Sequence, residues 1–403
     1  MRLYFLLVRI AALFGHRKAR LLIQGQRDVR AFLKSAPEQE PAIWIHAASV
    51  GEFEQARPLI ERWKAERPKD RIVVTFFSPS GYTLRKDYPL ADQVLYLPFA
   101  TRRNAKLFLN VIRPTKAIFV KYDFWPAYLR ELKRRNIPTY LISGIFTPDQ
   151  LFFKPWGGPY RRLLNNFTTL FVQDEASKEL LKSVKSEVIV AGDTRFDRVC
   201  HIADNPRILP AIEHFAQSSI SELTPTQDKI IVAGSTWPED EALLARYIAE
   251  RDGIKLILAP HEIDEEHLHH IFQLFRGRYV RYTEATPMNV LHVNTLVIDT
   301  IGLLSSIYRY GHVAYIGGGF GAGIHNTLEP AVYGLPILFG PKYQQFREAK
   351  GLIAAGAAQS IKTYEEFATA MDNALANAAE IGQKSAEYVR SELGATEKIF
   401  KNL

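Results

Sequence analysis

The chain has 403 residues, which is too long for a single ordinary hydrophobic core and sufficient for two domains. Its hydrophobic content of 47% excludes an intrinsically disordered chain, and the presence of one cysteine, Cys200, excludes an internal disulfide. The formal net charge of +8 favours an anionic partner, which composition alone leaves open among phosphorylated lipid, a membrane surface and nucleic acid.

The first segment is apolar and basic. Apolar residues repeat at helical spacing over residues 3–14, but Arg9 interrupts them, and the stretch is shorter than the about 20 residues that span a bilayer. It also lacks the small-residue cleavage site of a signal peptide. A basic tail follows, with Arg17, Lys18, Arg20, Arg27 and Arg30. We therefore expect an interfacial helix on an anionic membrane surface; a helix packed on its own domain is the alternative.

Between residues 42 and 193, segments rich in Val, Ile, Phe and Tyr alternate with helical patterns. This alternation predicts parallel strands with crossover helices on both faces of a sheet. The expected strands are Ala42–Ala48, Arg71–Phe77, Gln93–Phe99, Lys116–Asp123, Pro138–Phe146, Thr169–Asp174 and Glu187–Asp193.

Residues 205–228 contain three prolines and a polar run, which predicts a short helix and a linker. The alternating pattern then restarts. The expected strands are Lys229–Ser235, Lys255–His261, Tyr279–Glu284, Thr295–Thr300, Val313–Gly319 and Leu335–Gly340, and a helix is expected over Tyr364–Leu393. The sequence therefore predicts two doubly wound Rossmann-like α/β domains, 1–204 and 229–385, facing a central cleft, with a final helix at 386–403 that can return to the first domain.

A first candidate site lies in the run from His46 to Phe53, where an expected strand leads into a helix. The small residues Ser49 and Gly51 let a ligand approach the free amides at the start of that helix. Glu52 follows them and faces the expected cleft, where a carboxylate can act as a general base. The alternative is that Glu52 only complements the helix dipole.

A second candidate site is the glycine cluster that begins at Gly317. A helix is expected to start near His325 or Asn326, and the amides at a helix start favour a phosphate. Glu329, one turn inside that helix, can accept hydrogen bonds from ribose hydroxyls. The spacing fits neither a P-loop nor a dinucleotide fingerprint and is typical of the nucleotide-binding half of glycosyltransferases with two Rossmann-like domains. A tight structural turn is the alternative.

Ser235 and Thr236 lie at another strand–turn–helix junction. Their hydroxyls can cap the helix or contact the phosphate of a donor, and the sequence leaves both readings open.

The segment 146–166 mixes aromatic residues with cations, among them Lys154, Trp156, Arg161 and Arg162. Such a mixture suits an acceptor with acyl chains and phosphates at a bilayer surface, single-stranded nucleic acid, or an ordinary amphipathic loop.

The histidines at positions 261, 267, 269 and 270 lack the spacing of a zinc-binding helix, so we expect a solvated helix face and no metal site.

In this order, the three strand–turn–helix motifs resemble those of the 3-deoxy-D-manno-octulosonic acid (Kdo) transferases, and the resemblance covers nearly the whole chain. It implies a GT-B fold, CMP-Kdo as donor, a lipid A precursor with a phosphorylated disaccharide as acceptor, and no cofactor. Glu52 occupies the glutamate of the family's S-x-G-E stretch, which implies that it is the catalytic base. The residues Gly318, Gly319, His325, Asn326 and Glu329 fall on the family's G-G-x-N-x-L-E donor motif, and residues 192–197 resemble its G-N-x-K-F-D segment.

Three positions depart from the family's pattern. Asp123 stands at the second acidic position of an E-x-E-x-W-P stretch, on a shorter side chain, and the resemblance places it with Glu52 in the catalytic site. His261 stands where an arginine is common, and a neutral histidine holds a phosphate or carboxylate less firmly, although the resemblance still implies donor binding there. Ile145 stands at the arginine of an N-A-R stretch. These departures leave open a different acidic sugar or a different lipid.

Together, motifs and resemblance predict direct displacement with inversion at the anomeric carbon. Glu52 would accept the proton of the acceptor hydroxyl, while the glycine loop, Ser235 and Thr236 stabilise the leaving CMP phosphate without a metal. The expected location is the cytoplasmic face of the bacterial inner membrane, as a peripheral or monotopic protein, with no nucleic-acid partner. The alternatives are a GT-B enzyme with another nucleotide-sugar donor, an epimerase-like relative, and a non-catalytic basic protein that binds nucleic acid.

Overall fold

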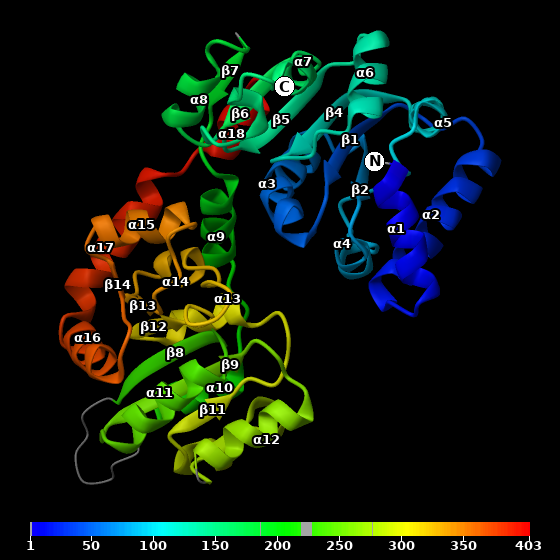
Figure 1. Cartoon of the computed structure of the whole chain (residues 1–403). Helices are drawn as coiled ribbons and strands as arrows, with labels where there is room; N and C mark the ends of the chain where they lie inside the picture. The colour runs from blue at the N-terminus through cyan, green and yellow to red at the C-terminus, as the bar shows by residue number, and fades with distance from the viewer. Residues whose placement is uncertain (1, 186, 219–227, 276) are drawn as a thin grey trace. The chain divides into compact units, whose positions relative to one another are not determined.

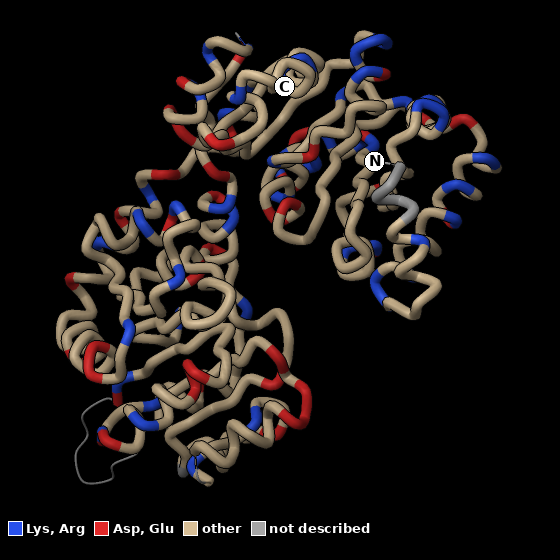
Figure 2. Tube along the Cα trace, viewed as in Figure 1, with Lys and Arg blue, Asp and Glu red and all other residues tan. Residues whose placement is uncertain are grey.

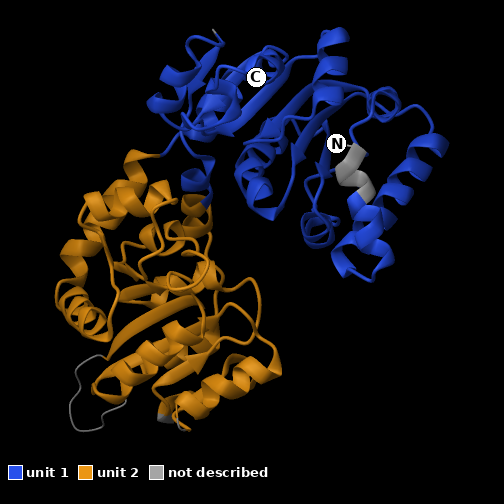
Figure 3. Ribbon diagram, viewed as in Figure 1, with its two compact units in different colours: residues 1–198, 393–403 blue, residues 199–392 orange. Residues whose placement is uncertain are grey.

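The computed structural model describes residues 2–185, 187–218, 228–275 and 277–403. The chain forms two compact units: unit 1 comprises residues 1–198 and 393–403, and unit 2 comprises residues 199–392 (Figure 3). Each unit contains one seven-stranded parallel sheet between helices (Figure 1). The prediction of an α/β protein with two doubly wound Rossmann-like domains is therefore confirmed.

The sheet of unit 1 has the strand order β3-β2-β1-β4-β5-β6-β7. Its strands are β1 (Ala42–Ala47), β2 (Arg71–Phe76), β3 (Gln93–Tyr96), β4 (Pro114–Val120), β5 (Thr139–Gly144), β6 (Thr169–Val172) and β7 (Val188–Val190). The chain builds the sheet outward from β1 in one direction and then outward from β4 in the other. In doubly wound sheets, ligands bind at the carboxyl ends of the strands at such a switch point.

Both faces of this sheet are buried. All six residues of β1 are buried, and alternate residues of a strand point to opposite faces. Trp44 of β1 packs in one hydrophobic core with Phe108 and Leu129, whereas its neighbours Ile43 and Ile45 pack in another. The two cores hold the carboxyl ends of β1 and β4 side by side.

The helices of unit 1 connect these strands. They are α1 (Arg2–Leu13), α2 (Arg17–Ser35), α3 (Val50–Glu66), α4 (Pro79–Arg85), α5 (Arg102–Ile112), α6 (Pro126–Arg134), α7 (Gly158–Leu164), α8 (Glu175–Leu181) and α18 (Ala395–Lys401), with a short 3-10 turn at Leu151–Phe153; α9 (Thr194–Asp204) leads into unit 2. No helix among the described residues is long and apolar enough to cross a membrane.

The helix α18 packs in unit 1, although unit 2 precedes it in the sequence. Ile399 is fully buried in the core that lies against α3, and the ring of Phe400 packs edge-on against Trp63 at 5.4 Å. The carboxylate of Asp197 accepts hydrogen bonds from the amides of Gly394 and Thr396, at 2.8 and 2.6 Å, and so fixes the start of the helix.

Unit 2 repeats the same design, with the strand order β10-β11-β9-β8-β12-β13-β14. Its strands are β8 (Lys229–Thr236), β9 (Ile254–Pro260), β10 (Tyr279–Arg281), β11 (Thr295–Val297), β12 (Val313–Ile316), β13 (Ile337–Phe339) and β14 (Ala358–Ser360). Its helices are α10 (Pro210–Gln217), α11 (Pro238–Ala249), α12 (Glu265–Leu274), α13 (Leu304–Ile307), α14 (Leu328–Ala331), α15 (Arg347–Ala354), α16 (Tyr364–Ala376) and α17 (Ala378–Ser391). The switch point of this sheet lies between β8 and β12.

Three elements differ from the sequence predictions. The helix expected to start near His325 or Asn326 begins at Leu328 and has four residues; residue 330 is proline and has no amide to donate to the Asn326 carbonyl. The single helix expected over residues 364–393 is divided at Asn377 into α16 and α17. The edge strand β14 was not predicted. Part of the predicted linker, residues 219–227, lies outside the described residues.

Candidate functional site

The carboxyl end of β1 presents Glu52 at the switch point of unit 1. Ser49 is the N-cap of α3, and Glu52 lies in the first helical turn, half-buried. The Ser49 hydroxyl donates a hydrogen bond to the Glu52 carboxylate, which fixes the orientation of that carboxylate. Gly51 is exposed, and a Cβ there would lie 3.8 Å from the Ser49 hydroxyl, so the fold itself does not require glycine at this position.

Asp123 follows β4, which is the neighbour of β1 in the sheet. Its Oδ2 atom lies 3.3 Å from Nε2 of His46, a fully buried histidine of β1. That Nε2 accepts a hydrogen bond of 2.9 Å from the Trp125 indole, so the ring proton resides on Nδ1, which lies 2.9 Å from the Thr75 hydroxyl. Oδ2 of Asp123 is buried and receives no hydrogen bond within the described part of the chain. A buried carboxylate oxygen without a donor is costly and favours a ligand hydroxyl or a water as its partner.

The backbone is strained near the carboxyl ends of strands in both sheets. Lys121 after β4, Ser143 in β5 and Ser235 in β8 have φ values of 57°, 55° and 54°. A positive φ in a residue other than glycine is uncommon and clusters at ligand-binding sites.

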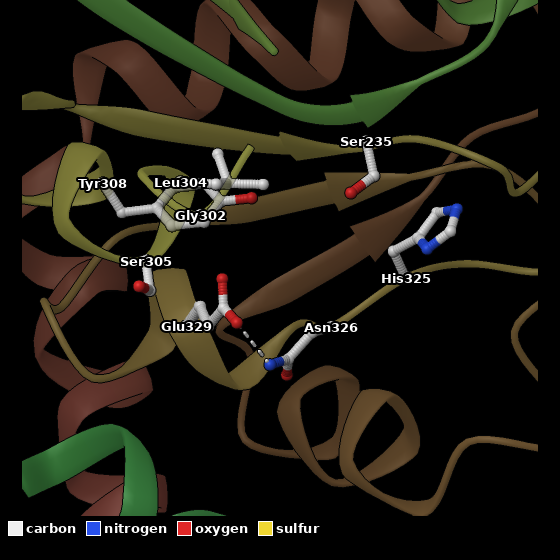
Figure 4. Close-up of a pocket in the computed structure, with 8 residues that line it drawn as sticks. All are labelled: Ser235, Gly302, Leu304, Ser305, Tyr308, His325, Asn326 and Glu329. Carbon is white, nitrogen blue, oxygen red and sulfur yellow. Dashed lines mark hydrogen bonds between the residues drawn. The ribbon is translucent and has the colours of Figure 1, made fainter. Parts of the chain in front are cut away.

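A cavity of about 240 Å³ lies at the switch point of unit 2 (Figure 4). It is lined by Ser235, Gly302, Leu304, Ser305, Tyr308, His325, Asn326 and Glu329. The structure thus brings together four of the predicted donor-site residues: Ser235, His325, Asn326 and Glu329. The sequence analysis missed the segment 302–308, because its serines and its tyrosine form no recognisable motif.

Asn326 organises the floor of this cavity. Its side-chain amide donates a hydrogen bond of 3.0 Å to Glu329 (Figure 4). Its side-chain oxygen accepts one of 3.0 Å from the Leu328 amide. The Glu329 carboxylate is thereby held at the cavity, where it can accept hydrogen bonds from hydroxyl groups of a ligand.

Two amides of the glycine loop donate hydrogen bonds to other parts of unit 2. The Gly317 amide donates to the Gly234 carbonyl at 3.0 Å, and the Gly318 amide donates to Asp240 at 2.9 Å. Asp240 is buried and also accepts a hydrogen bond of 2.6 Å from the Tyr315 hydroxyl. Burial raises the pKa of Asp240 above its usual value, while these hydrogen bonds oppose the rise. The amides of Gly317 and Gly318 are therefore engaged within the protein.

Close packing explains two of the glycines in this loop. A Cβ on Gly317 would lie 2.3 Å from the Ser235 carbonyl oxygen, and a Cβ on Gly319 would lie 2.6 Å from the backbone of Gly340. The loop can approach both neighbouring strand ends only because these residues lack side chains.

Thr236 lies outside the cavity lining. Its buried hydroxyl donates to Glu241 at 3.0 Å, and Glu241 is 2.9 Å from His267 Nε2. Burial raises the pKa of Glu241, and the bond from His267 opposes this. His267 is thus packed on a buried carboxylate, which corrects the expectation of a wholly solvated histidine face; His269 and His270 are exposed as expected.

His261, Trp237 and His325 form an aromatic stack beside the glycine loop. The ring centroids are 4.7 Å apart for Trp237 and His261, and 4.5 Å apart for His261 and His325. The pKa of His325 is lowered, first by burial and then by the charge that His261 can carry. Among the described residues, no cluster of three or more histidine, cysteine, aspartate or glutamate side chains could hold a metal ion.

The predicted acceptor residues lie in two groups on unit 1. Arg17 and Lys18 are exposed at the start of α2, whereas Arg20 donates to the Ala12 carbonyl at 3.1 Å and joins α2 to α1. In the second group, Arg162 is exposed, Lys154 is half-buried and Trp156 is 69% exposed.

Arg161 has a partly structural role, because its guanidinium donates to the carbonyls of Phe152 and Lys154, at 3.0 Å each.

Comparisons with known proteins complete this description. Residues 24–198 match the family model of 3-deoxy-D-manno-octulosonic-acid transferase (kdotransferase). A Chlamydia trachomatis serovar A protein named 3-deoxy-D-manno-octulosonic acid transferase is 29% identical over 314 residues, which cover 75% of this chain and 70% of that protein. A Rickettsia bellii protein of the same name is 27% identical over 390 residues, covering 91% and 89%.

The crystal structure of UDP-GlcNAc 2-epimerase from Neisseria meningitidis bound to UDP-GlcNAc superposes with a TM-score of 0.60. The match covers 90% of this chain and 98% of that chain at 15% sequence identity, so it bears on the fold alone. With the two Rossmann-like units it confirms the predicted GT-B fold class.

Proposed function

Because the chain belongs to the Kdo transferase family, we propose that this glycosyltransferase transfers Kdo from CMP-Kdo to a lipid A precursor in lipopolysaccharide biosynthesis. The observation that carries the proposal is the family match over residues 24–198, which contain both Glu52 and Asp123. These two carboxylates follow adjacent strands at the switch point of a doubly wound sheet, the place where such sheets bind ligands.

In this proposal Glu52 is the general base. An acceptor hydroxyl attacks the anomeric carbon of Kdo, its proton passes to Glu52, and the bond from that carbon to the phosphate oxygen of CMP breaks with inversion. The hydrogen bond from Ser49 supports this role because it orients the carboxylate before the acceptor arrives. The unpartnered oxygen of Asp123 would accept a hydrogen bond from a second hydroxyl of the sugar acceptor or donor.

The cavity of unit 2 would hold the nucleotide. Glu329, positioned by Asn326, would accept hydrogen bonds from the ribose hydroxyls. Since the Gly317 and Gly318 amides are engaged within the protein, the phosphate would be held by the Ser235 hydroxyl and the His325 ring. One negative charge develops on the leaving CMP, and hydroxyl and imidazole donors suffice to stabilise it without a metal ion.

We further propose that the protein works at the cytoplasmic face of the bacterial inner membrane, held there peripherally through unit 1. The basic residues at the start of α2 and the exposed Trp156 support this, because both suit the interface of an anionic membrane.

A second donor class deserves a direct test, because His261 and Ile145 replace arginines that the family resemblance leads one to expect. The test incubates the protein with lipid A precursor and either CMP-Kdo or UDP-sugars, followed by mass spectrometry of the lipid. The expected result is a mass increase of one or more Kdo residues with CMP-Kdo alone. Transfer from a UDP-sugar without transfer from CMP-Kdo would replace the proposed donor, and no transfer with either would remove the proposed function.

A further inference from the structure

Two side chains of unit 1 meet at one atom of His46, its Nε2. This atom lies 2.9 Å from the indole nitrogen of Trp125 and 3.3 Å from Oδ2 of Asp123. The strand β1, which carries His46, has no lysine, arginine, aspartate or glutamate (Figure 2), and His46 is its only side chain that can accept a hydrogen bond. A neutral imidazole nitrogen either accepts a hydrogen bond or donates one. Nε2 can therefore serve Trp125 or Asp123, but not both.

The indole decides between these two partners. An indole N–H can only donate, so Nε2 accepts from Trp125 and carries no proton. Without that proton His46 has nothing to donate to Asp123, and Oδ2 faces a nitrogen whose lone pair is taken. This explains why Oδ2 is buried without a hydrogen bond within the described part of the chain, although a histidine lies 3.3 Å away.

The other side of the imidazole ring accommodates either position of the proton. Nδ1 lies 2.9 Å from the Thr75 hydroxyl and 3.1 Å from the Thr75 carbonyl oxygen. The hydroxyl accepts a hydrogen bond of 2.8 Å from the Trp44 indole and keeps a proton of its own, so it can accept from Nδ1 or donate to it. The carbonyl favours a proton on Nδ1, but a charge-assisted bond from Nε2 to a carboxylate is stronger than this neutral one. Removal of the Trp125 indole would therefore move the proton to Nε2 and pair it with Asp123.

The position of Trp125 is fixed by its backbone and by packing. It is the N-cap of α6 and precedes Pro126, which favours the extended backbone observed, with a φ of −88° and a ψ of 95°. Its ring packs against Phe77, with ring centroids 4.8 Å apart. The indole N–H therefore meets His46 in a set geometry before any substrate binds.

We propose that Trp125 and His46 are positioning residues that keep Asp123 open to substrate. The indole occupies Nε2 of His46, which prevents the histidine from pairing with the carboxylate. Asp123, whose side chain is 15% exposed, then accepts its missing hydrogen bond from a hydroxyl of the acceptor sugar. The inference rests on the proposed function and deepens it, because it states how the second carboxylate of the site in unit 1 is kept ready for the acceptor.

The first test reads the position of the ring proton directly, in the full-length protein without substrates. A two-bond nitrogen–proton correlation spectrum of protein with nitrogen-15 histidine distinguishes a protonated ring nitrogen from an unprotonated one. The His46 signals are identified by their absence in His46→Phe. The wild type is expected to carry the proton on Nδ1, and Trp125→Phe is expected to carry it on Nε2. The same proton position in both proteins would overturn the proposal.

The second test measures binding of a lipid A precursor in detergent micelles by calorimetry, which needs no turnover. Trp125→Phe should bind the precursor about tenfold more weakly, because His46 then occupies the free oxygen of Asp123. The dissociation constant of CMP-Kdo should stay within about twofold. The matched control is Trp63→Phe, which removes a comparable indole hydrogen bond in unit 1, to Asp70 at 2.8 Å, from another buried tryptophan. It should bind both substrates normally.

The double variant Trp125→Phe/His46→Phe separates this role from packing. It removes the indole and also the nitrogen that would pair with Asp123, so acceptor binding should return to within about threefold of wild type. Acceptor binding as weak as in Trp125→Phe, or weaker, would make Trp125 a packing residue and overturn the proposal. Normal acceptor binding by Trp125→Phe with its proton on Nε2 would also overturn it, since Asp123 would then not serve the acceptor.

Folding and catalysis are read separately from these results. Melting temperatures within about 5 °C of wild type would show that each variant is folded. If the double variant does not fold, the proton position and the acceptor binding of Trp125→Phe still decide. Absence of Kdo transfer in the wild type would remove the proposed function and leave both measurements standing, whereas an unmoved ring proton would remove this inference and leave Kdo transfer intact.

Discussion

At the scale of single residues, the carboxylates at the two switch points differ in their burial and in their hydrogen-bond partners. Glu52 is half-buried and oriented by one hydroxyl, whereas Asp240 is buried and accepts hydrogen bonds from the Gly318 amide and the Tyr315 hydroxyl. The first arrangement leaves a carboxylate that a ligand can reach. The second serves to fix a backbone. These differences support the proposal that Glu52 accepts the proton, whereas Asp240 positions the loop.

The first prediction concerns Glu52→Gln. Glutamine keeps the shape of the side chain but cannot accept the acceptor's proton, so turnover should fall about 10²- to 10⁴-fold while the dissociation constant of CMP-Kdo stays within about twofold. Turnover is measured by mass spectrometry of the lipid and donor binding by calorimetry. Glu66→Gln, at the far end of α3, is the matched control and should keep normal turnover. A Glu52→Gln enzyme with more than about a tenth of wild-type turnover would exclude Glu52 as the base.

A second prediction uses the lowered pKa of His325. The free ring is neutral near neutral pH, and a bound phosphate would favour its cation, so binding couples to protonation. The affinity for CMP-Kdo, whose phosphodiester keeps one negative charge over this range, should therefore rise, about three- to tenfold, as the pH falls from about 8 to about 6. His325→Gln should abolish this pH dependence.

His312→Gln is the matched control for this experiment. Burial also lowers the pKa of His312, but this residue accepts a hydrogen bond from the Ile230 amide at 3.0 Å and does not line the cavity. Its substitution should leave the pH dependence of CMP-Kdo binding intact. If His325→Gln and the wild type show the same pH profile, His325 does not contact the phosphate.

At the scale of helices and strands, α2 depends on close contact with β3. A Cβ on Gly25 would lie 2.2 Å from Cε2 of Tyr96, so the helix can approach the sheet only because this residue is glycine. We predict that Gly25→Ala lowers the free energy of unfolding by about 1–3 kcal/mol, despite the better helix propensity of alanine.

The effect of Gly25→Ala is measured by thermal unfolding of the full-length protein. The matched control is Gly158→Ala in α7, where a Cβ would lie 3.8 Å from the Arg161 guanidinium, an ordinary van der Waals distance. It should be neutral within about 0.5 kcal/mol. An unchanged melting temperature for Gly25→Ala would mean that α2 moves away from Tyr96 without cost.

The sequence predicted most strands because each is a short buried run of β-branched and aromatic residues between turn signals. It could not predict β14, whose residues Ala358, Gln359 and Ser360 carry no apolar pattern. It also predicted one helix over 364–393, since Ala376-Asn377-Ala378 contains neither proline nor glycine to mark the break. Local sequence patterns were sufficient for the strands whose position is determined by the burial of their apolar residues.

The candidate site shows the same limit. Ser235, Asn326 and Glu329 were predicted from motifs and line one cavity, but the fate of the glycine amides depends on Asp240, 78 residues away from Gly318 along the chain. That contact arises from the pairing of β8 with β12 and has no local signal.

At the scale of the whole molecule, the proposal divides the substrates between the units. We predict that CMP protects the amides of residues 235–241 and 302–329 from hydrogen exchange and leaves residues 42–125 unchanged, because the nucleotide would contact unit 2. Exchange of the full-length protein is followed by mass spectrometry with and without CMP. Protection confined to unit 1 would contradict the assignment of the nucleotide to the cavity at Glu329. The Asp252→Ala variant, at an exposed loop of unit 2, should show the wild-type pattern.

The return of α18 to unit 1 has a consequence for biosynthesis. A ribosome makes residues 1–198 first, yet the core that receives Ile399 stays incomplete until residues 393–403 have been translated. Unit 2 receives all of its residues earlier, by Glu392. During translation, the unit that is begun first therefore lacks the helix that packs against α3 until the final residues have been made.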